Sequence, residues 1–319
     1  MTAQKFSRRA ALGRAGLAIG AAWASSRVAM AADSAAVNHS SDPFIFCLNT
    51  ATIRGQKLGL IKEFEIAAQA GYQAIEPWIS SIDDFTKAGG SLKDARKKLG
   101  DLGLKMESAI GFPEWLVDDD QKRAKGMERA KYELDLVSQL GGKRLAAPPA
   151  GATNTPGLDL LQAAERYRAL LELGDQAGVV PQLELWGFSK NFYRLGQCAC
   201  AAIETGHPKA CVLADIFHLY KGGSDFHGLK LLAANTVQVL HMNDYPSEPP
   251  REKINDSYRV FPGDGSGPVV EILRLLRATG GQKVLSLEVF NRAYWERDAL
   301  EVARAGLEKM KAVAAKAMS

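Results

Sequence analysis

Short apolar runs alternate with longer amphipathic stretches from residue 43 to the end of the chain. The runs are FIFCL at 44–48, QAIE at 73–76, LKMESA at 104–109, KRLAA at 143–147, VPQLE at 180–184, CVLAD at 211–215, VQVLH at 237–241 and VLSLE at 284–288. Each run is bounded by Gly, Pro or polar residues, which is typical of buried strands. The stretches between them carry helical periodicity, most clearly at 58–70, 121–140, 158–177 and 296–315.

Strand–helix alternation predicts right-handed βαβ units around a parallel sheet. Eight such units can close into a (β/α)8 TIM barrel, an α/β fold for which 319 residues is an ordinary length. An open doubly wound sheet is the competing interpretation, and it often carries a glycine-rich phosphate loop after its first strand. The turn here reads CLNTATIRG and contains no G-x-G-x-x-G. We therefore expect a single barrel domain over 43–319.

The N-terminus is typical of an export signal rather than of the fold. It has a basic start, SRRAALG at 7–13, a modest apolar run at 15–24 and a small-residue cleavage site at 29–31. The paired Arg8 and Arg9 resemble a twin-arginine signal. The alternative, an uncleaved anchor, is disfavoured because the run is too short to span a bilayer. We expect a signal peptide at 1–31, a polar linker at 32–42, a periplasmic location and no membrane contact after cleavage.

The net charge of +4 belongs to that leader. Residues 1–31 hold five basic side chains and no acid, so subtracting five from 40 leaves 35 basic against 36 acidic residues. A near-neutral body offers no strong field for nucleic acid, which excludes nucleic acid as an expected partner. The four cysteines, Cys47, Cys198, Cys200 and Cys211, are expected to be buried or neutral thiols, since substrates of this route fold in a reducing compartment.

Four late strands end in residues that bind metals. They are Glu184, Asp215, His241 and Glu288. In a TIM barrel, functional side chains lie at the carboxyl ends of the strands, so these four can converge on one point. Each residue alone has an ordinary alternative as a helix cap, a salt-bridge partner or a structural hydrogen bond. Three carboxylates and one imidazole together suit a divalent ion such as Mn2+, with Co2+, Mg2+ or Zn2+ as alternatives.

These residue types also suggest a reaction. A divalent metal on a carbonyl and a hydroxyl oxygen would stabilise the enediolate that forms when the adjacent proton is removed. Glu184 and Glu288 could take that proton from one face and return one on the other, which inverts the carbon. Return to the same face, or loss of a β-hydroxyl, would give isomerisation or dehydration from almost the same site.

The motifs around these residues are similar to those of the xylose isomerase-like TIM barrel superfamily. They are LELWG with Glu184, ADIFHLY with Asp215 and His218, HMND with His241, PGDG at 262–265 and LEVFN with Glu288. The resemblance is to the sugar phosphate isomerase/epimerase group, which includes ketose 3-epimerases and inosose dehydratases. It implies that Glu184 and Glu288 both bind metal and move protons, and that His218 contacts substrate. It also implies a substrate-binding arginine after the seventh strand, for which Arg259 is the first choice and Arg251 the second, and a homo-oligomer.

Other polar and aromatic side chains follow the strand ends. They are Glu76, Trp78, Trp186, Asn243, Asp244 and Phe290. We predict Glu76, Trp78 and Trp186 to contact substrate, the two tryptophans because aromatic rings stack on sugars, with loop packing as the alternative. Asp244 could orient His241 or cap a loop. The PGDGSG run lacks the Lys-Ser/Thr of a nucleotide loop, so we predict a turn with Ser266 as a helix N-cap.

The sequence therefore predicts a metal-dependent isomerase or epimerase of a free or keto sugar. Export argues against phosphorylated substrates. The alternatives are a lyase or dehydratase of a keto sugar or inosose on the same site, and a non-catalytic sugar-binding barrel. A repair nuclease of the same superfamily is disfavoured because its zinc cluster needs many histidines and the chain has five.

Overall fold

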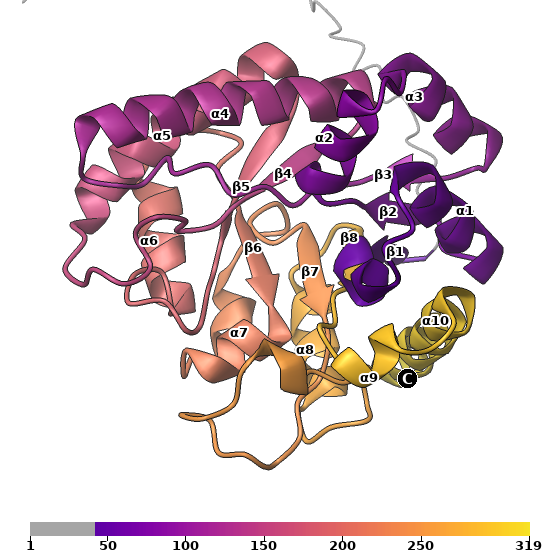
Figure 1. Cartoon of the computed structure of the whole chain (residues 1–319). Helices are drawn as coiled ribbons and strands as arrows, with labels where there is room; N and C mark the ends of the chain where they lie inside the picture. The colour runs from indigo at the N-terminus through magenta and orange to yellow at the C-terminus, as the bar shows by residue number, and fades with distance from the viewer. Residues whose placement is uncertain (1–41) are drawn as a thin grey trace, which may run out of the picture. The chain divides into compact units, whose positions relative to one another are not determined.

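The computed structural model describes residues 42–319. The predicted signal peptide at 1–31 and nearly all of the linker at 32–42 lie outside the described residues. Within the described range, eight strands form one sheet in the order β3-β2-β1-β8-β7-β6-β5-β4 (Figure 1). They are β1 Phe44–Asn49, β2 Ala74–Glu76, β3 Lys105–Met106, β4 Arg144–Ala147, β5 Val180–Glu184, β6 Val212–Asp215, β7 Val239–Met242 and β8 Lys283–Leu287. Each lies at a predicted apolar run, and the paired strands run parallel.

The sheet curls into a barrel because its first strand pairs with its last. The predicted third strand at 104–109 is reduced to two residues. The chain there bonds first to β2 and then to β4, so it does not form one regular strand. The N–H of Glu107 still donates to Ile75 O at 3.2 Å, whereas Ala109 bonds the fourth strand instead. Its N–H donates to Arg144 O at 3.0 Å and its carbonyl accepts from Ala146 N at 2.9 Å. These bonds link the two ends of the sheet, and the predicted TIM barrel is confirmed.

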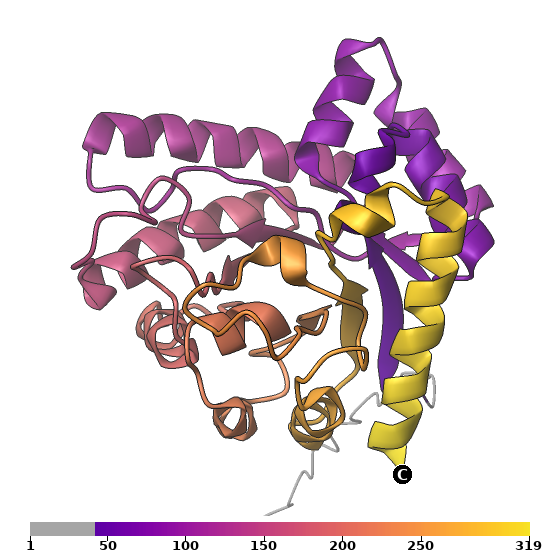
Figure 2. The same ribbon diagram turned by 60° about the horizontal axis from the view of Figure 1, so that its bottom comes forward.

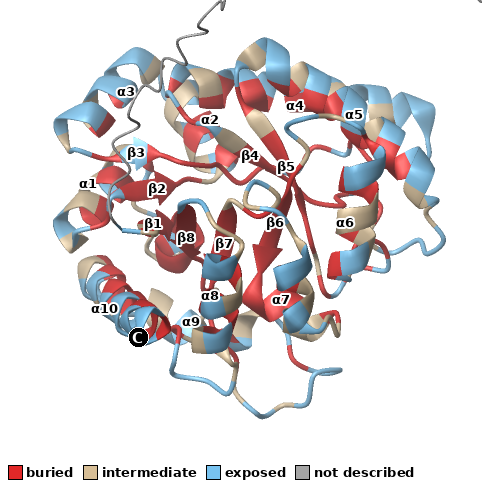
Figure 3. Cartoon of the chain, turned by 180° about the vertical axis from the view of Figure 1, so that it is seen from behind, coloured by how far each residue is buried: buried red, intermediate tan, exposed pale blue. Residues whose placement is uncertain are grey.

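Helices cover the outside of the sheet (Figure 2). Over the described range they are α1 Leu60–Ala70, α2 Ile79–Lys87, α3 Leu92–Asp101, α4 Asp120–Gln139, α5 Leu160–Ala177, α6 Leu195–Glu204, α7 Ile216–Lys221, α8 Val269–Ala278, α9 Arg292–Trp295 and α10 Ala299–Met318, with 3-10 turns η1 Thr50–Gln56, η2 Phe226–Leu231 and η3 Asp256–Tyr258. Their buried faces meet the strands and their exposed faces point outward (Figure 3). None of the helices in residues 42–319 has the length and apolar character needed to cross a membrane.

The PGDGSG segment differs from its prediction. α8 begins at Val269 after Pro268, so Ser266 is not its N-cap and that prediction is wrong. The cause is Asp244, whose carboxylate accepts backbone N–H groups from Gly263, Gly265 and Gly267 at 2.8–3.1 Å. Because three backbone N–H groups bond to one carboxylate, the segment stays a loop and the helix begins later in the sequence than predicted. Of the two roles left open for Asp244, the loop cap is the one observed.

The cysteines match expectation. Among the described residues all four are free, and Cys47, Cys198 and Cys211 are buried. Burial raises the pKa of the Cys211 thiol to about 11, so this group is neutral at ordinary pH.

Glu63 on α1 is a buried carboxyl that the helical pattern did not reveal. Its Oε1 accepts from Ser81 of α2 at 3.2 Å, and its Oε2 has no hydrogen-bond partner among the described residues. Burial raises the pKa of Glu63 to about 7, although Ser81 and Arg54 oppose the shift. An unfolded glutamate titrates near 4.5, so between these two values the folded chain binds more protons than the unfolded chain, and stability falls as pH rises.

Glu63→Gln is expected to remove this dependence. Relative to the parent chain, the free energy of unfolding of the variant should rise by roughly 1–3 kcal/mol between pH 5 and pH 8. Urea denaturation of both proteins at the two pH values measures the difference. If the free energies of unfolding of the variant and the parent differ by the same amount at pH 5 and pH 8, the raised pKa of Glu63 is contradicted.

Candidate metal centre

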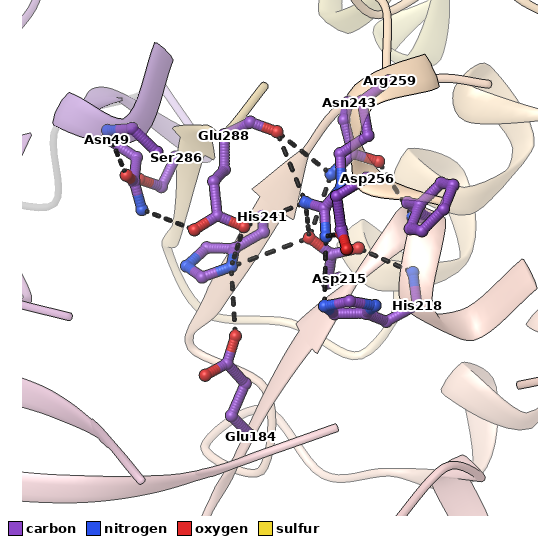
Figure 4. Close-up of polar contacts among 12 residues, drawn as sticks. Asn49, Glu184, Asp215, His218, His241, Asn243, Asp256, Arg259, Ser286 and Glu288 are labelled. Carbon is purple, nitrogen blue, oxygen red and sulfur yellow. Dashed lines mark hydrogen bonds and ion pairs between the residues drawn. The ribbon is translucent and has the colours of Figure 1, made fainter. Parts of the chain in front are cut away.

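The four predicted ligands meet at the carboxyl ends of β5 to β8 (Figure 4). Asp215 and His241 are direct register partners at the ends of β6 and β7. Glu288 follows β8, and its N–H donates to Met242 O at 3.0 Å, which continues the ladder by one residue. Glu184 ends β5. Because carboxyl ends of parallel strands share one rim, the side chains point into the same opening.

His241 lies at the centre of the cluster. Its Nδ1 is 3.2 Å from Glu288 Oε2, 3.7 Å from Asp215 Oδ2 and 3.7 Å from Glu184 Oε1. One ligand atom from each of Asp215, His241 and Glu288 lies within 4.8 Å of the others. Glu184 faces the same nitrogen but is not part of that triad.

The charges and the unpaired atoms of this cluster fit a divalent cation. Within the described chain, His241 Nδ1 and Glu184 Oε2 are buried and have no hydrogen-bond partner. Burial raises the pKa of Glu184 to about 8, with the carboxylates of Glu288 and Asp215 adding to the rise and His241 opposing it. Buried carboxylates so close together need more positive charge than the neighbouring side chains provide. Carboxylate oxygens and one imidazole nitrogen are ligands that Mn2+, Co2+, Mg2+ or Zn2+ accept.

Glu76 lies beneath His241 rather than in the substrate opening. Its Oε2 is 3.1 Å from His241 Nε2 and accepts hydrogen bonds from Ser286 Oγ at 2.6 Å and Asn49 Nδ2 at 2.9 Å. The side chain is fully buried and does not line the cavity above the cluster. Its expected role as a substrate contact is therefore corrected, because a carboxylate on the far nitrogen of the imidazole orients the ring instead.

Asn49 is a site residue that the sequence analysis missed. Its Nδ2 donates to Glu76 and also to Glu288 Oε1 at 3.1 Å, which links the two carboxylates. Asn49 is the last residue of β1 and the register partner of Glu76. The four predicted ligands were identified because each ends an apolar run and has a metal-binding side chain. Asn49 also lies at the end of its strand, but its side chain is an amide.

Arg259 enters the cluster from the long loop after β7. Its Nη1 donates to Asp215 Oδ2 and Glu288 Oε2, both at 2.9 Å, and its side chain is 1% exposed. Its Nη2 lies 3.0 Å from His218 Nε2. Glu288 Oε2 has a second lone pair, so it can accept from the guanidinium and still face a cation, whereas Asp215 Oδ2 also accepts from Asn243 Nδ2 at 2.9 Å. Arg251, the second choice, is half-exposed and pairs with Glu252.

The loop that carries Arg259 is fixed at both sides. Val260 and Asp244 exchange two backbone hydrogen bonds of 2.9 Å, which places residue 259 over the ends of β6 and β8. Asn291 Nδ2 donates to Arg259 O at 3.0 Å. Asp256, three residues earlier, accepts from Arg259 Nη2 and was not identified from the sequence, since nothing in a loop of this length marks it.

His218 lies beside Arg259 on α7. Asp215 Oδ1 accepts the N–H of His218 at 2.7 Å, so the same aspartate caps α7 and faces His241. Asn243 reinforces this arrangement, donating to Asp215 Oδ2 at 2.9 Å and accepting the N–H of Phe217 at 2.9 Å. Asn243 thus lies behind Asp215, whereas His218 lines the opening above it.

A cavity of about 230 Å³ opens above the cluster. Its lining residues are Trp78, Ile110, Phe112, Glu184, Trp186, Phe188, His218, Asp256, Arg259, Glu288 and Phe290. The structure thus brings the predicted Trp78, Trp186, His218 and Arg259 together around one opening. Phe112 and Phe188 were not predicted, because they lie on loops without a local pattern.

Known proteins share this architecture. A family model described as "Xylose isomerase-like TIM barrel" matches residues 64–313. An inosose isomerase of Bacillus velezensis is 24% identical over 85% of this chain and 97% of its own. A 3-dehydroshikimate dehydratase of Pseudomonas aeruginosa is 26% identical over 74% of this chain, which spans only 37% of the length of that protein.

Solved structures agree on the fold. The IOLI protein with a bound zinc atom superposes with a TM-score of 0.80 at 20% identity, covering 86% of this chain and 99% of that one. An L-ribulose 3-epimerase superposes with a TM-score of 0.68 at 19% identity, covering 86% and 95%. The family match spans well over half of the sequence and includes β2 to β8 and the cluster of acids. The chain belongs to the xylose isomerase-like TIM barrel family.

Proposed function

We propose that this protein is a divalent-metal-dependent enzyme that moves a proton next to the carbonyl of a free or keto sugar, as an isomerase or epimerase. Relatives named as inosose isomerase and L-ribulose 3-epimerase support this reaction class. The observation that carries the proposal is the pair Glu184 and Glu288. Each lines the cavity, each directs one oxygen at His241 Nδ1, and β6 and β7 separate the strands that they follow.

Glu184, Asp215, His241 and Glu288 would hold the metal. The cation would supply electrostatic stabilisation of the negative charge that forms on the substrate oxygens during proton removal. Glu184 and Glu288 exchange the proton, since a carboxylate on either side of the carbon can act as base and its conjugate acid can return a proton.

Arg259 and His218 orient the substrate. Both lie on the cavity wall beside Glu288, where a guanidinium and an imidazole can bond sugar hydroxyl or carbonyl oxygens. Arg259 also holds the carboxylates of Asp215 and Glu288 in place. Substrate orientation and carboxylate placement therefore depend on the same side chain.

A dehydratase is the second candidate. The relatives named as 3-dehydroshikimate dehydratase favour it. Removal of the same proton, followed by loss of a hydroxyl on the next carbon, needs only that one glutamate returns its proton to the leaving oxygen. The site can serve either outcome, and the position of the substrate hydroxyl decides between them.

The proposal predicts metal-dependent proton exchange with solvent. The protein should incorporate deuterium from D2O at the carbon beside the carbonyl of a free keto sugar or inosose, as followed by NMR. Chelation should abolish incorporation, and Mn2+, Co2+, Mg2+ or Zn2+ should restore it. The accompanying product, an epimer, an isomer or a dehydrated sugar, identifies the reaction. Exchange that persists after complete removal of metal, or no exchange on any keto sugar, would refute the proposal.

Export is a separate proposal supported by the basic leader with its paired arginines. It predicts a periplasmic enzyme and free rather than phosphorylated substrates. The same deuterium assay run on matched sugars and sugar phosphates tests the second expectation. Equal or faster exchange on the phosphates would contradict it.

A further inference from the structure

Five aromatic side chains form a ring around the cavity, here called the aromatic collar: Trp78, Phe112, Trp186, Phe188 and Phe290. Successive ring centroids lie 6.1 Å apart from Phe290 to Trp78, then 5.1 Å, 5.9 Å and 5.1 Å along the series to Phe188. His218 closes the ring at 5.5 Å from Phe188, and the Arg259 guanidinium lies 5.1 Å from Phe290. The collar is therefore continuous.

The cavity has a polar floor and an apolar wall. Its charged groups, Glu184, Glu288, Arg259 and Asp256, gather beside the metal centre with His218. The collar adds few hydrogen-bonding groups above them, because three of its members are phenylalanines and the Trp78 Nε1–H is already donated to Asn49 Oδ1 at 3.2 Å. A ligand that fills both parts needs a polar end and an apolar end.

The collar is held in place by the loops that carry it. Phe112 follows Gly111, where an added Cβ would lie 2.1 Å from Glu133 Oε2, so a larger residue here would have to displace this buried carboxylate. Phe188 lies in a tight turn closed by the bond from Ser189 N to Trp186 O at 3.0 Å. Trp186 N also donates to Phe192 O at 3.1 Å. Rings on braced loops are prepared for a ligand of matching shape.

The collar is larger than one sugar ring requires. A sugar stacks its apolar face on one or two rings, whereas five rings surround this opening. Phe112 and Phe188 are 40% and 49% exposed and continue the apolar surface of the neighbouring tryptophan rings, and a contiguous exposed apolar patch at a cavity marks a binding site. Of the collar, these two rings are the exposed ones, so they line the part of the cavity that is open to solvent.

We propose that the collar binds a planar apolar group carried by the substrate, so that the substrate class is an aryl glycoside of a keto sugar rather than a bare monosaccharide. This inference rests on the proposed function for the identity of the polar end. The aryl group contacts Phe112 and Phe188 while the sugar carbonyl reaches Glu184 and Glu288. Edge-to-face and offset contacts with the surrounding rings make the protein select an aryl group over an aliphatic group.

Binding calorimetry on the metal-loaded protein tests the inference without requiring turnover. The probes are phenyl β-D-glucoside and methyl β-D-glucoside, each also in keto form. The phenyl compound of each pair is expected to bind about tenfold or more tightly than the methyl compound. Phe112→Ala and Phe188→Ala should lower the phenyl affinity several-fold more than the methyl affinity.

Leu231→Ala is the matched control, because Leu231 is 81% exposed and lies outside the cavity. It should alter neither affinity, and thermal melting of each variant verifies folding. Equal affinities of the phenyl and methyl compounds, including no binding of either, overturn the inference, as does an equal loss of both in the phenylalanine variants. Failure of the proposed function is distinguishable, since it would leave the phenyl preference intact while deuterium incorporation is absent.

Discussion

Glu288→Gln and Glu184→Gln are each expected to lower turnover by about 10²–10⁴-fold, the range that a positioned acid–base group contributes. Glutamine keeps the shape and one oxygen of the side chain but cannot accept a proton. The effect should fall on kcat, because the exchange is made in the transition state and not in the bound ground state. Net conversion, measured at saturating metal and substrate, gives the loss.

The two variants also separate the roles of the glutamates. If each glutamate serves one face of the carbon, each variant keeps one working base. One variant should then still exchange deuterium into one epimer without inverting it, and the other variant should do so only with the opposite epimer. A single-base enzyme would lose both exchanges in one variant. The pattern therefore reports the stereochemistry that the placement of β5 and β8 suggests.

Glu63→Gln provides the matched control for these variants. It makes the same chemical change at a carboxyl that is equally buried, 4% exposed, but lies between α1 and α2 on the outside of the barrel. Its turnover should equal that of the parent. Metal content measured on every variant distinguishes loss of the ion from loss of the base. Turnover of either catalytic variant within about threefold of the parent, with metal bound, would remove the glutamate from the proposed chemistry.

The barrel could be predicted because its signals are local. Each strand is a short apolar run closed by glycine, proline or polar residues, and helices such as α1 end at a glycine in the left-handed region, here Gly71 with φ 95°. The placement of Glu184, Asp215, His241 and Glu288 follows from the same runs, since each is the last residue of one. Parallel topology then brings those ends to one rim without further information.

Depth within the barrel could not be predicted. Glu76 is also the last residue of its strand, but its carboxylate lies under His241 and not in the opening. The reason is its register, since Glu76 pairs with Asn49 of β1 and not with the next residue along that chain segment. Register and stagger arise from pairing between strands that are distant in sequence. Phe112, Phe188 and Asp256 were missed for a related reason, as loop conformations depend on tertiary contacts such as the one between Gly111 and Glu133.

The position of Glu76 leads to the second large effect. Its Oε2 faces His241 Nε2 at 3.1 Å, so the carboxylate favours a proton on that nitrogen and would leave Nδ1 to bind a cation held among Glu184, Asp215 and Glu288. Glu76→Gln retains the volume of the side chain but removes its charge, and its amide can turn an N–H toward the imidazole. Loss of such an outer partner typically costs about 10–100-fold in metal affinity.

We therefore expect Glu76→Gln to weaken metal binding by about 10–100-fold, measured by competition with a fluorescent chelator. Because Glu76 does not line the cavity, turnover should recover when the metal concentration is raised, and the substrate KM should be unchanged at saturation. Glu63→Gln, which replaces a buried carboxyl remote from His241, should bind metal as the parent does. A Glu76→Gln protein with unchanged metal affinity, or one whose lost turnover is not restored by excess metal, would show that Glu76 does not act through the orientation of His241.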